Sequence, residues 1–457
     1  MPHSSEQLLQ LLQRLLKRPH HVQQIHCLLI TEGHLLWNKK WKSTLLYNAL
    51  IRAHLGFGQT RKSLLLFTRM LLHQTAPNSH TFPSLVKSAS LSSPSLGLPL
   101  HAQAVKRGVL RDPFVQTSFV SFYAVYAELR DACKVFDEMS ERCLVSCNAM
   151  IDAFCKNGDM GSALCLFERM PERDVVSWTS VVNGFRTSMR FHEAIRFFGK
   201  MMSCSAKANE ATYVSVLSSC ASLNGWGGLY MGKQVHGHIL RNEIQLTVFV
   251  GTALIDLYGK SGLLKAAANV FDQMVVKEVC SWNAMISALS SNGQEKEALD
   301  LFEKMKMEGL LPNEVTFVAV LTACSRGKFV KCGLELFKSM SIDYGVVPVM
   351  EHYGCVADLL GRAGLLREAV SFIKSMPLEP DASVLGTLLG ACKIHGITEL
   401  GNELGQKLLD LQPQHSGRYV VLSNINAAVQ RWDHAAELRK MMLNAGLEKT
   451  PAYSMVT

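Results

Sequence analysis

The amino-acid sequence predicts an all-α protein, an α-solenoid built from stacked helical hairpins. The stretch from Val279 to Asn313 shows the basic unit, because apolar residues recur there at helical spacing in two short segments. Gly293 separates the two segments. Gly309 and Pro312 end the second one, in the way that a left-handed C-terminal cap followed by proline ends a helix. Two helices this short cannot enclose a core alone, so each hairpin needs neighbours.

The rest of the chain supplies these neighbours, because the same phrases return at intervals of 31 to 38 residues. In most hairpins the second helix closes on an aromatic residue followed three positions later by methionine, at Phe67, Phe136, Phe167, Phe198, Phe271, Phe302 and Phe337. The opening phrase recurs in the same phase, beginning at Ser146, Ser177 and Ser281. Periods in this range are typical of a solenoid of helix pairs.

The periodicity divides most of the chain into ten repeats. Their predicted boundaries are 44–78, 79–112, 113–143, 144–174, 175–209, 210–247, 248–278, 279–313, 314–349 and 350–381. Two further helix pairs, 382–415 and 416–449, lack the aromatic-x-x-Met phrase, and residues 450–457 form a tail. A length of 457 residues would suggest about three compact domains, but the repeats predict one continuous superhelix instead.

Composition narrows the classes of partner. The formal net charge is +9, from 47 Lys and Arg against 38 Asp and Glu, which favours a polyanionic partner without proving one. No apolar run approaches 18 residues, so no membrane-spanning helix is expected.

Cysteine usage indicates a reducing compartment. There are 13 cysteines, an odd number, and most fall inside the repeats as small apolar helix residues, for example Cys155, Cys165, Cys220, Cys324 and Cys392. No Cys-x-x-Cys pair occurs, since the nearest pair is Cys143 and Cys147. We therefore expect neither a zinc site nor another cofactor.

Residues 1–43 allow two interpretations. Their leucine-rich helical pattern is basic and poor in acids, as in an organelle transit segment. Alternatively, His26 occupies the same phase as His101 and His236, so the segment is also readable as the second helix of a truncated repeat. For all three histidines a packing role is favoured over metal binding, because they lie in separate repeats.

From position 44 onward the sequence resembles a plant pentatricopeptide repeat protein of the subfamily that alternates long, short and standard repeats. The phrases Val-Ser-Trp-Asn, Phe-Glu-Lys-Met and Gly-Leu-Leu-Pro-Asn stand in the family register. Residues 382–449 resemble the paired terminal E motifs, most clearly around Tyr419 and Trp432. The resemblance implies a right-handed superhelix that binds single-stranded RNA, one nucleotide per repeat.

In this family the fifth and last residues of each repeat select the base, because an unpaired base exposes its hydrogen-bonding edge. The resemblance implies four reading pairs, Asn48 with Asn78, Asn148 with Asp174, Thr179 with Asn209, and Asn283 with Asn313. Their implied preferences are a pyrimidine, uracil, adenine and a pyrimidine. Thr117 and Thr252 hold the reading position, but their partners Cys143 and Glu278 fall outside the usual pairs. The simpler alternative is an ordinary helix-start residue.

A second set of residues stands thirteen positions into the repeat. Its members are basic: Lys156, Lys260, Arg326 and Arg362. In the family this position faces phosphate, where a cation adds salt-dependent affinity with little sequence preference. The alternative is a solvated charge at the turn between the helices.

The resemblance implies a guide in C-to-U RNA editing that is not itself an enzyme. Longer relatives end in a zinc-dependent deaminase, whose His-x-Glu and Cys-x-x-Cys motifs supply three zinc ligands and a glutamate acid/base, and this chain stops before that point. The expected partners are an organelle RNA and, through 382–449, a separate DYW-type cytidine deaminase with other editing factors, without membrane contact. We expect a mitochondrial location, with the chloroplast as alternative. The alternative function is transcript stabilisation, splicing or translation without editing.

Overall fold

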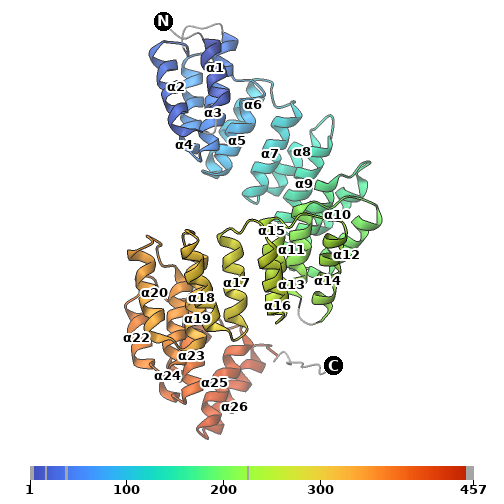
Figure 1. Ribbon diagram of the computed structural model, residues 1–457. Helices are drawn as coiled ribbons and strands as arrows, with labels where there is room; N and C mark the ends of the chain where they lie inside the picture. The colour runs from blue at the N-terminus through green and yellow to red at the C-terminus, as the bar shows by residue number, and fades with distance from the viewer. Residues whose placement is uncertain (1–4, 16–17, 36–39, 224–225, 449–457) are drawn as a thin grey trace. The chain divides into compact units, whose positions relative to one another are not determined.

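The computed structural model describes residues 5–15, 18–35, 40–223 and 226–448, and within them the chain is helical (Figure 1). These residues form 26 α-helices and one short 3-10 helix, and they contain no β-strand. The chain divides into two compact units, residues 1–223 and residues 224–457. The expected all-α solenoid of helical hairpins is thereby confirmed as the fold class. The predicted tail 450–457 and parts of 1–43 lie outside the described residues.

The N-terminal unit contains thirteen of the α-helices in the described residues. They are α1 (Ser5–Arg14), α2 (Pro19–Thr31), α3 (Lys40–Gly56), α4 (Thr60–Leu72), α5 (Phe82–Ser90), α6 (Gly97–Lys106), α7 (Pro113–Val125), α8 (Leu129–Asp137), α9 (Leu144–Lys156), α10 (Met160–Arg169), α11 (Val175–Thr187), α12 (Phe191–Ser203) and α13 (Glu210–Ser222). The 3-10 turn η1 (Pro94–Leu96) precedes α6.

The C-terminal unit contains the other thirteen. They are α14 (Trp226–Arg241), α15 (Val248–Lys260), α16 (Leu264–Gln273), α17 (Val279–Ser291), α18 (Glu295–Met307), α19 (Glu314–Gly327), α20 (Val330–Ile342), α21 (Met350–Arg362), α22 (Leu366–Lys374), α23 (Ala382–His395), α24 (Thr398–Leu411), α25 (Ser416–Ala428) and α26 (Trp432–Asn444).

Within each unit the helices alternate between two roles. The odd-numbered helices from α3 onward, which we call A helices, pack on one another in succession, as α7, α9 and α11 do in the first unit and α15, α17 and α19 in the second. Each even-numbered helix that follows an A helix of the same unit, a B helix, packs on that A helix, and most B helices also contact the next A helix. Every A helix from α7 to α25 begins at the first residue of a predicted repeat or terminal helix pair. The helix α3 starts four residues before Thr44 and α5 starts three residues after Ser79.

Glycines at the ends of the helices make the hairpin turns. Gly293, between α17 and α18, has φ +81°, and Gly309, after α18, has φ +76°. This left-handed region is open to glycine and strained for most other residues, so both helices end where the sequence places a glycine.

The aromatic-x-x-Met phrase forms the contact between a B helix and the next A helix. Phe302 and Met305 lie on one face of α18 and are 1% and 0% exposed. The Phe302 ring meets Phe317 of α19 edge-on at 6.3 Å between centroids. Burying such aromatic surface stabilises the stacking of hairpins, which explains why the phrase returns in most of the regular repeats.

The recurring histidines pack against the next A helix. The His26 ring meets that of His54 of α3 edge-on, whereas His101 and His236 are hydrogen-bonded to a tyrosine of that helix. His101 Nδ1 shares a 2.8 Å hydrogen bond with the Tyr123 hydroxyl, and His236 Nδ1 shares one of 2.7 Å with Tyr258. Burial lowers the pKa of both imidazoles and raises the pKa of Tyr123 to about 12. No group of three His, Cys, Asp or Glu in the described chain is placed to hold a metal ion.

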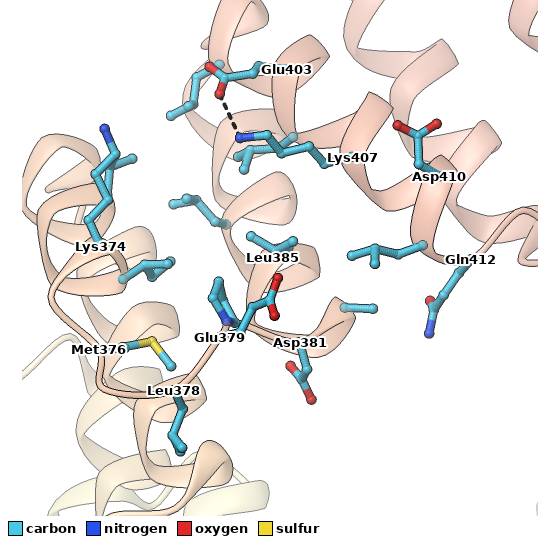
Figure 2. Close-up of a pocket in the computed structure, with 18 of the residues that line it drawn as sticks. Lys374, Met376, Leu378, Glu379, Asp381, Leu385, Glu403, Lys407, Asp410 and Gln412 are labelled. Carbon is cyan, nitrogen blue, oxygen red and sulfur yellow. Dashed lines mark hydrogen bonds and ion pairs between the residues drawn. The ribbon is translucent and has the colours of Figure 1, made fainter.

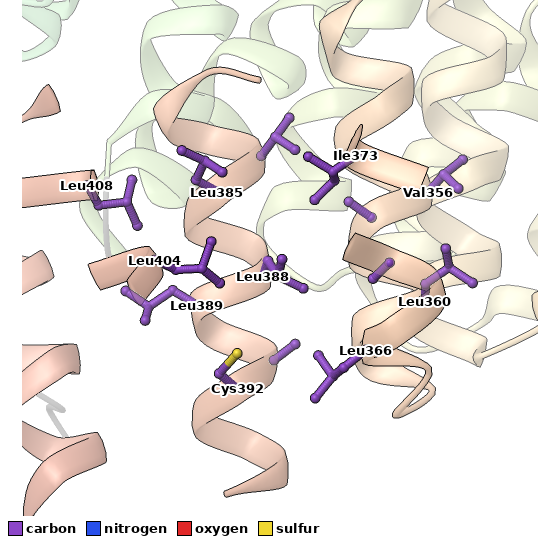
Figure 3. Packing of buried hydrophobic residues seen from close by; sticks show 14 of the residues in the cluster. Val356, Leu360, Leu366, Ile373, Leu385, Leu388, Leu389, Cys392, Leu404 and Leu408 are labelled. Carbon is purple, nitrogen blue, oxygen red and sulfur yellow. The ribbon is translucent and has the colours of Figure 1, made fainter. Parts of the chain in front are cut away.

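A continuous apolar core joins the last regular repeat to the first terminal hairpin (Figure 3). Val356 and Leu360 of α21 pack with Leu388 and Leu389 of α23 and with Leu404 of α24. The amides of Asn402 and Asn426 then exchange hydrogen bonds of 2.7 and 3.3 Å between α24 and α25. Residues 382–448 therefore continue the same stack.

The cysteines of the described chain are free thiols. Cys155, Cys220, Cys324 and Cys392 are buried as expected, whereas Cys165 is exposed, because it lies on the outward face of α10. Among the described residues, no helix is both long and apolar enough to cross a membrane.

Candidate nucleic-acid interface

At each reading pair the structure brings together three side chains, of which the sequence singled out two. They are the fifth and last residues of one repeat and the third residue of the next. We call each such set a junction. The third residues, Thr81, Ser177, Thr212 and Thr316, are 0–1% exposed. Each junction lies where two successive A helices meet.

The junction after repeat 144–174 shows the full pattern. Asn148 Nδ2 donates to Asp174 Oδ1 at 3.1 Å, and the Ser177 hydroxyl lies 2.7 Å from Asn148 Oδ1 and 2.8 Å from Asp174 Oδ1. The Ser177 backbone N–H also donates to Asp174 Oδ1, at 2.8 Å, which makes Asp174 the N-cap of α11 in a capping box.

Asp174 is held as an anion. Burial alone would raise the pKa of its carboxyl, but hydrogen bonds from Ser177, Asn148 and the backbone of Val176 outweigh burial and leave the pKa below its ordinary value. The side chain therefore acts as a hydrogen-bond acceptor.

The next junction, of Thr179, Asn209 and Thr212, has the same arrangement of three side chains but different polar groups. The hydroxyls of Thr179 and Thr212 share a 2.7 Å hydrogen bond, and Thr179 Oγ1 lies 3.4 Å from Asn209 Oδ1. Asn209 Oδ1 accepts from the Thr212 N–H at 2.9 Å, so it caps α13 as Asp174 caps α11. Oδ1 has the same role in both junctions. The second terminal atom differs, because it is a carboxylate oxygen in Asp174 and an amide nitrogen in Asn209.

The two asparagine pairs repeat this geometry. Asn48 Nδ2 donates to Asn78 Oδ1 at 3.0 Å, and the Thr81 hydroxyl donates to Asn48 Oδ1 at 2.7 Å. Asn283 Nδ2 donates to Asn313 Oδ1 at 3.2 Å, which also accepts from the Thr316 N–H at 3.0 Å.

The fifth and last residues differ in accessibility. Asn48, Asn148 and Asn283 are only 8%, 8% and 5% exposed. Asn209 and Asn313 are exposed. Asn283 Oδ1 is buried and has no hydrogen-bond partner among the described residues, which is uncommon for a polar atom. The fifth residue thus positions the last one and leaves an unsatisfied acceptor in one repeat.

The two weaker candidates form incomplete junctions. Thr117 Oγ1 donates to its own helix, at Pro113 O (2.6 Å), and the Ser146 hydroxyl donates to the Cys143 carbonyl. Thr252 Oγ1 shares a 3.2 Å hydrogen bond with the Ser281 hydroxyl. Glu278 is exposed and its side chain does not cap α17. Neither threonine is therefore joined to the last residue of its repeat.

Three of the four basic residues at position thirteen are paired with an aspartate one helical turn earlier. The distances are 2.7 Å for Lys156 to Asp152, 2.8 Å for Lys260 to Asp256 and 2.7 Å for Arg362 to Asp358. These are exposed (i, i+4) pairs, which contribute little stability and are weakened by salt. Arg326 is exposed and has Thr322 at the equivalent position.

A separate groove lies between the B helices at the C-terminal end of the repeats (Figure 2). It has a volume of about 1140 Å³, with Met376, Leu378 and Leu385 among its apolar lining residues. Lys374 stands on one side. On the other side Lys407 pairs with Glu403 at 3.0 Å. An apolar floor with a charged rim is the usual character of a protein-binding surface.

These features define a class of protein, a helical-hairpin solenoid with one polar junction per reading repeat. Models of the PPR repeat match residues 46–74, 145–175, 176–205, 252–279 and 351–379, a PPR repeat family model matches 277–326, and an E motif model matches 395–457. A putative pentatricopeptide repeat-containing protein of Arabidopsis thaliana is 51% identical over 99% of this chain and 98% of its own length. The chain therefore belongs to the pentatricopeptide repeat family.

Other relatives support the same family, and a solved structure supports the same fold. A putative chloroplastic family member of Arabidopsis thaliana is 39% identical over 90% of this chain and 74% of its own length, and a putative mitochondrial one is 34% identical over 91% and 61%. The crystal structure of the pentatricopeptide repeat protein PPR10 in complex with an 18-nucleotide psaJ RNA element superposes with a TM-score of 0.63. It is 17% identical and covers 88% of this chain and 61% of that one. At this identity the likeness supports the fold alone.

The sequence interpretation missed two sets of residues. The third-position hydroxyls were visible as the serine of Val-Ser-Trp-Asn, but their bonds to the preceding repeat depend on helix packing. The aspartates at position nine were visible as an (i, i+4) spacing to the cations.

Proposed function

We propose that this protein binds single-stranded RNA along its A helices, with one nucleotide at each repeat. The single observation behind this proposal is the second terminal atom of the last residue, which varies between acceptor and donor, while Oδ1 of that residue is contacted by the fifth residue in all four pairs. A helix cap needs only Oδ1 of the last residue. Capping alone therefore does not explain why the fifth residue donates a second hydrogen bond to that side chain.

The chemistry of the junctions matches particular bases. Uracil offers the N3–H donor, which suits the ionised Asp174, and adenine offers the N1 acceptor, which suits the Asn209 amide nitrogen. The asparagine pairs at Asn78 and Asn313 favour a pyrimidine. These preferences follow the family register and form a spaced pattern, with Thr117 and Thr252 as weaker positions.

The basic residues at position thirteen contact phosphates in this proposal. Lys156, Lys260 and Arg362 exchange an aspartate for a phosphate oxygen, while Arg326 has no such exchange to make. Their contribution is salt-dependent and insensitive to base identity.

We further propose that the protein guides C-to-U editing in an organelle. The chain selects the site and a separate deaminase performs the chemistry, recruited through residues 382–449 and the groove between α22 and α24. If repeat 350–381 aligns four nucleotides upstream of the edited cytidine, a pyrimidine stands at −13 and −6, uracil at −10 and adenine at −9. The relatives named as chloroplastic and mitochondrial support an organelle, with the mitochondrion as our first choice.

The test is transcriptome-wide C-to-U editing in mitochondrial and plastid RNA from plants that lack this protein. Loss at one or a few cytidines with the pattern above supports a guide and identifies the organelle. An edited site that is lost but whose upstream sequence contradicts most of the pattern would reject the register. Intact editing with a changed transcript end or a retained intron would favour the alternative, an RNA-binding factor for stability, splicing or translation.

A further inference from the structure

The surface formed by the A helices continues past the last regular repeat as a hollow on the first terminal hairpin. Two adjoining cavities of about 460 and 360 Å³ lie along α19, α21 and α23 and share Asp358, Arg362, Ser383 and Thr387 in their walls. Gly354, Gly386 and Gly390 also line them. Gly354 and Gly386 hold the fifth position of 350–381 and 382–415. A Cβ added at Gly354 would make only an ordinary 3.7 Å contact with Val384, so the place of the reading amide is open at this first position.

An arginine from the second terminal hairpin enters this hollow. Arg418 is the third residue of 416–449, the position that holds a hydroxyl in the reading junctions. Its guanidinium lies against Gly386, since a Cβ added there would be 2.2 Å from Nη1. Nη2 donates to the Ala382 carbonyl oxygen at 3.0 Å. The Nε–H is buried and has no acceptor within the described chain.

The charges around the hollow leave Arg418 without a counter-ion in the described residues. Asp358 binds Arg362 at 2.7 Å and accepts from the Ser325 hydroxyl. Asp381 caps α23 through the N–H groups of Ser383 and Val384, at 3.0 and 2.9 Å. A partly buried guanidinium with an unsatisfied N–H is costly unless an outside acceptor completes it.

We propose that this hollow is a nucleotide-binding site for the residue that follows the one aligned with repeat 350–381. A phosphate oxygen accepts from Arg418, whose guanidinium fills the space at Gly386, and the base lies in the open space at Gly354. A guanidinium is suited to a phosphate, and glycine permits the close approach of a flat ring. The inference rests on the proposed function, because the RNA must already follow the A helices. An acidic protein segment would meet Arg418 too, but the hollow continues the reading surface and lies among the A helices.

The test compares two RNAs by equilibrium binding to the full chain. The shorter probe has ten nucleotides, from −13 to −4, with C, U, A and C at −13, −10, −9 and −6 and all four bases mixed elsewhere. The longer probe adds three uridines at its 3′ end. We expect the wild-type protein to bind the longer probe roughly fivefold more tightly, as for one added hydrogen bond of ordinary strength. Arg418→Gln should abolish this gain and reduce the salt slope for the longer probe by about 0.7.

Matched variants separate charge from folding. A Cβ added at Gly390 would meet nothing within 4 Å, so Gly390→Glu and Gly390→Gln start from an open position in the hollow and differ from each other in charge. Gly390→Glu should abolish the gain and Gly390→Gln should keep it. Lys407→Gln removes a cation from the α22–α24 groove and should also keep it.

The possible failures are distinguishable. An equal gain in wild type, Arg418→Gln and Gly390→Glu would overturn the inference and leave the proposed function standing, as expected if the hollow binds a protein segment. Equal weakening of both probes by Arg418→Gln would also overturn it. If the wild-type protein binds neither probe, the proposed function fails and this inference fails with it.

Discussion

The reading repeats and the C-terminal repeats use the same hairpin with different chemistry at the junction. After 144–174, Ser177 joins Asn148 to Asp174. After 314–349, His352 stands in the place of Ser177, accepts from the Val349 N–H at 3.1 Å and is bonded to the Glu314 carbonyl, without contacting a polar fifth residue. The third position therefore keeps its structural role in both regions. In the proposed function, base selection rests on the fifth and last residues, and the third residue supports them.

The most direct test is to replace the reading pair of repeat 144–174 with the pair found in repeat 175–209. We expect Asn148→Thr with Asp174→Asn to change the preference at −10 from uracil to adenine, because the frame is retained and an acceptor becomes a donor. Each preference should change by roughly tenfold, about 1.4 kcal/mol, as for one hydrogen bond exchanged for an unpaired group. Competition between RNAs that differ only at −10 measures the ratio. An unchanged ratio with normal affinity would refute base selection by this pair.

A substitution at the third position should affect both stability and base preference, and each less strongly than the exchange of a reading pair. Ser177→Ala removes the hydroxyl that supports Asn148 and Asp174, so we expect a stability loss of about 1 kcal/mol and weaker uracil preference. Ser121→Ala is the control, because the exposed Ser121 hydroxyl bonds only its own helix, at the Thr117 carbonyl. Urea unfolding and binding are measured on both. Loss of stability without loss of preference would mean that the third residue acts as a cap only.

Acid should affect the two units unequally. Burial, then nearby cationic groups, lower the pKa of His26 from 6.5 to about 4, and burial also lowers the pKa of His54 and His101 in the same unit. The unfolded chain takes up these protons first, so stability is complete above pH 6.5 and is lost as the pH falls toward 4. We expect proteolysis to reach the N-terminal unit first at pH 5, and His26→Leu to delay it. Equal cleavage of both units would contradict this.

The smallest expected effect concerns the cations. Asp256→Asn releases Lys260 from its exposed ion pair, so RNA affinity should rise by roughly twofold and the salt slope should steepen. Asp272→Asn, on the B helix of the same repeat, makes the same change in charge away from Lys260. Equal effects of the two variants would leave only the net charge of the protein to account for the change.

The sequence predicts local features of this molecule well. The helices follow from apolar periodicity, and the turns follow from residues such as Gly293 and Gly309. These signals are local, because each glycine affects the backbone only a few residues away. The helices of the structure confirm the predicted fold class, and the similar proteins confirm the predicted family. The reading pairs remain a prediction, although the bond from Asn148 to Asp174 gives them a physical form.

Contacts between repeats could not be predicted in the same way. The bond from Ser177 to Asn148 joins residues 29 apart, and Arg418 reaches Ala382 across 36 positions. Such contacts depend on how successive A helices stack, and no pattern inside one repeat reports that geometry. The exposure of Cys165 is a similar case, because the period identifies a helix more reliably than the face on which each small residue lies.

The most direct test of the central claim is selection of RNA from a fully random pool by the purified full chain. The account predicts enrichment of a spaced pattern, pyrimidine, two free positions, uracil, adenine, two free positions and a pyrimidine, with the uracil replaced by adenine when the Asn148→Thr, Asp174→Asn variant is used. Enrichment without this spacing, or a pattern that the double variant leaves unchanged, would contradict the claim that the polar junctions select the bases.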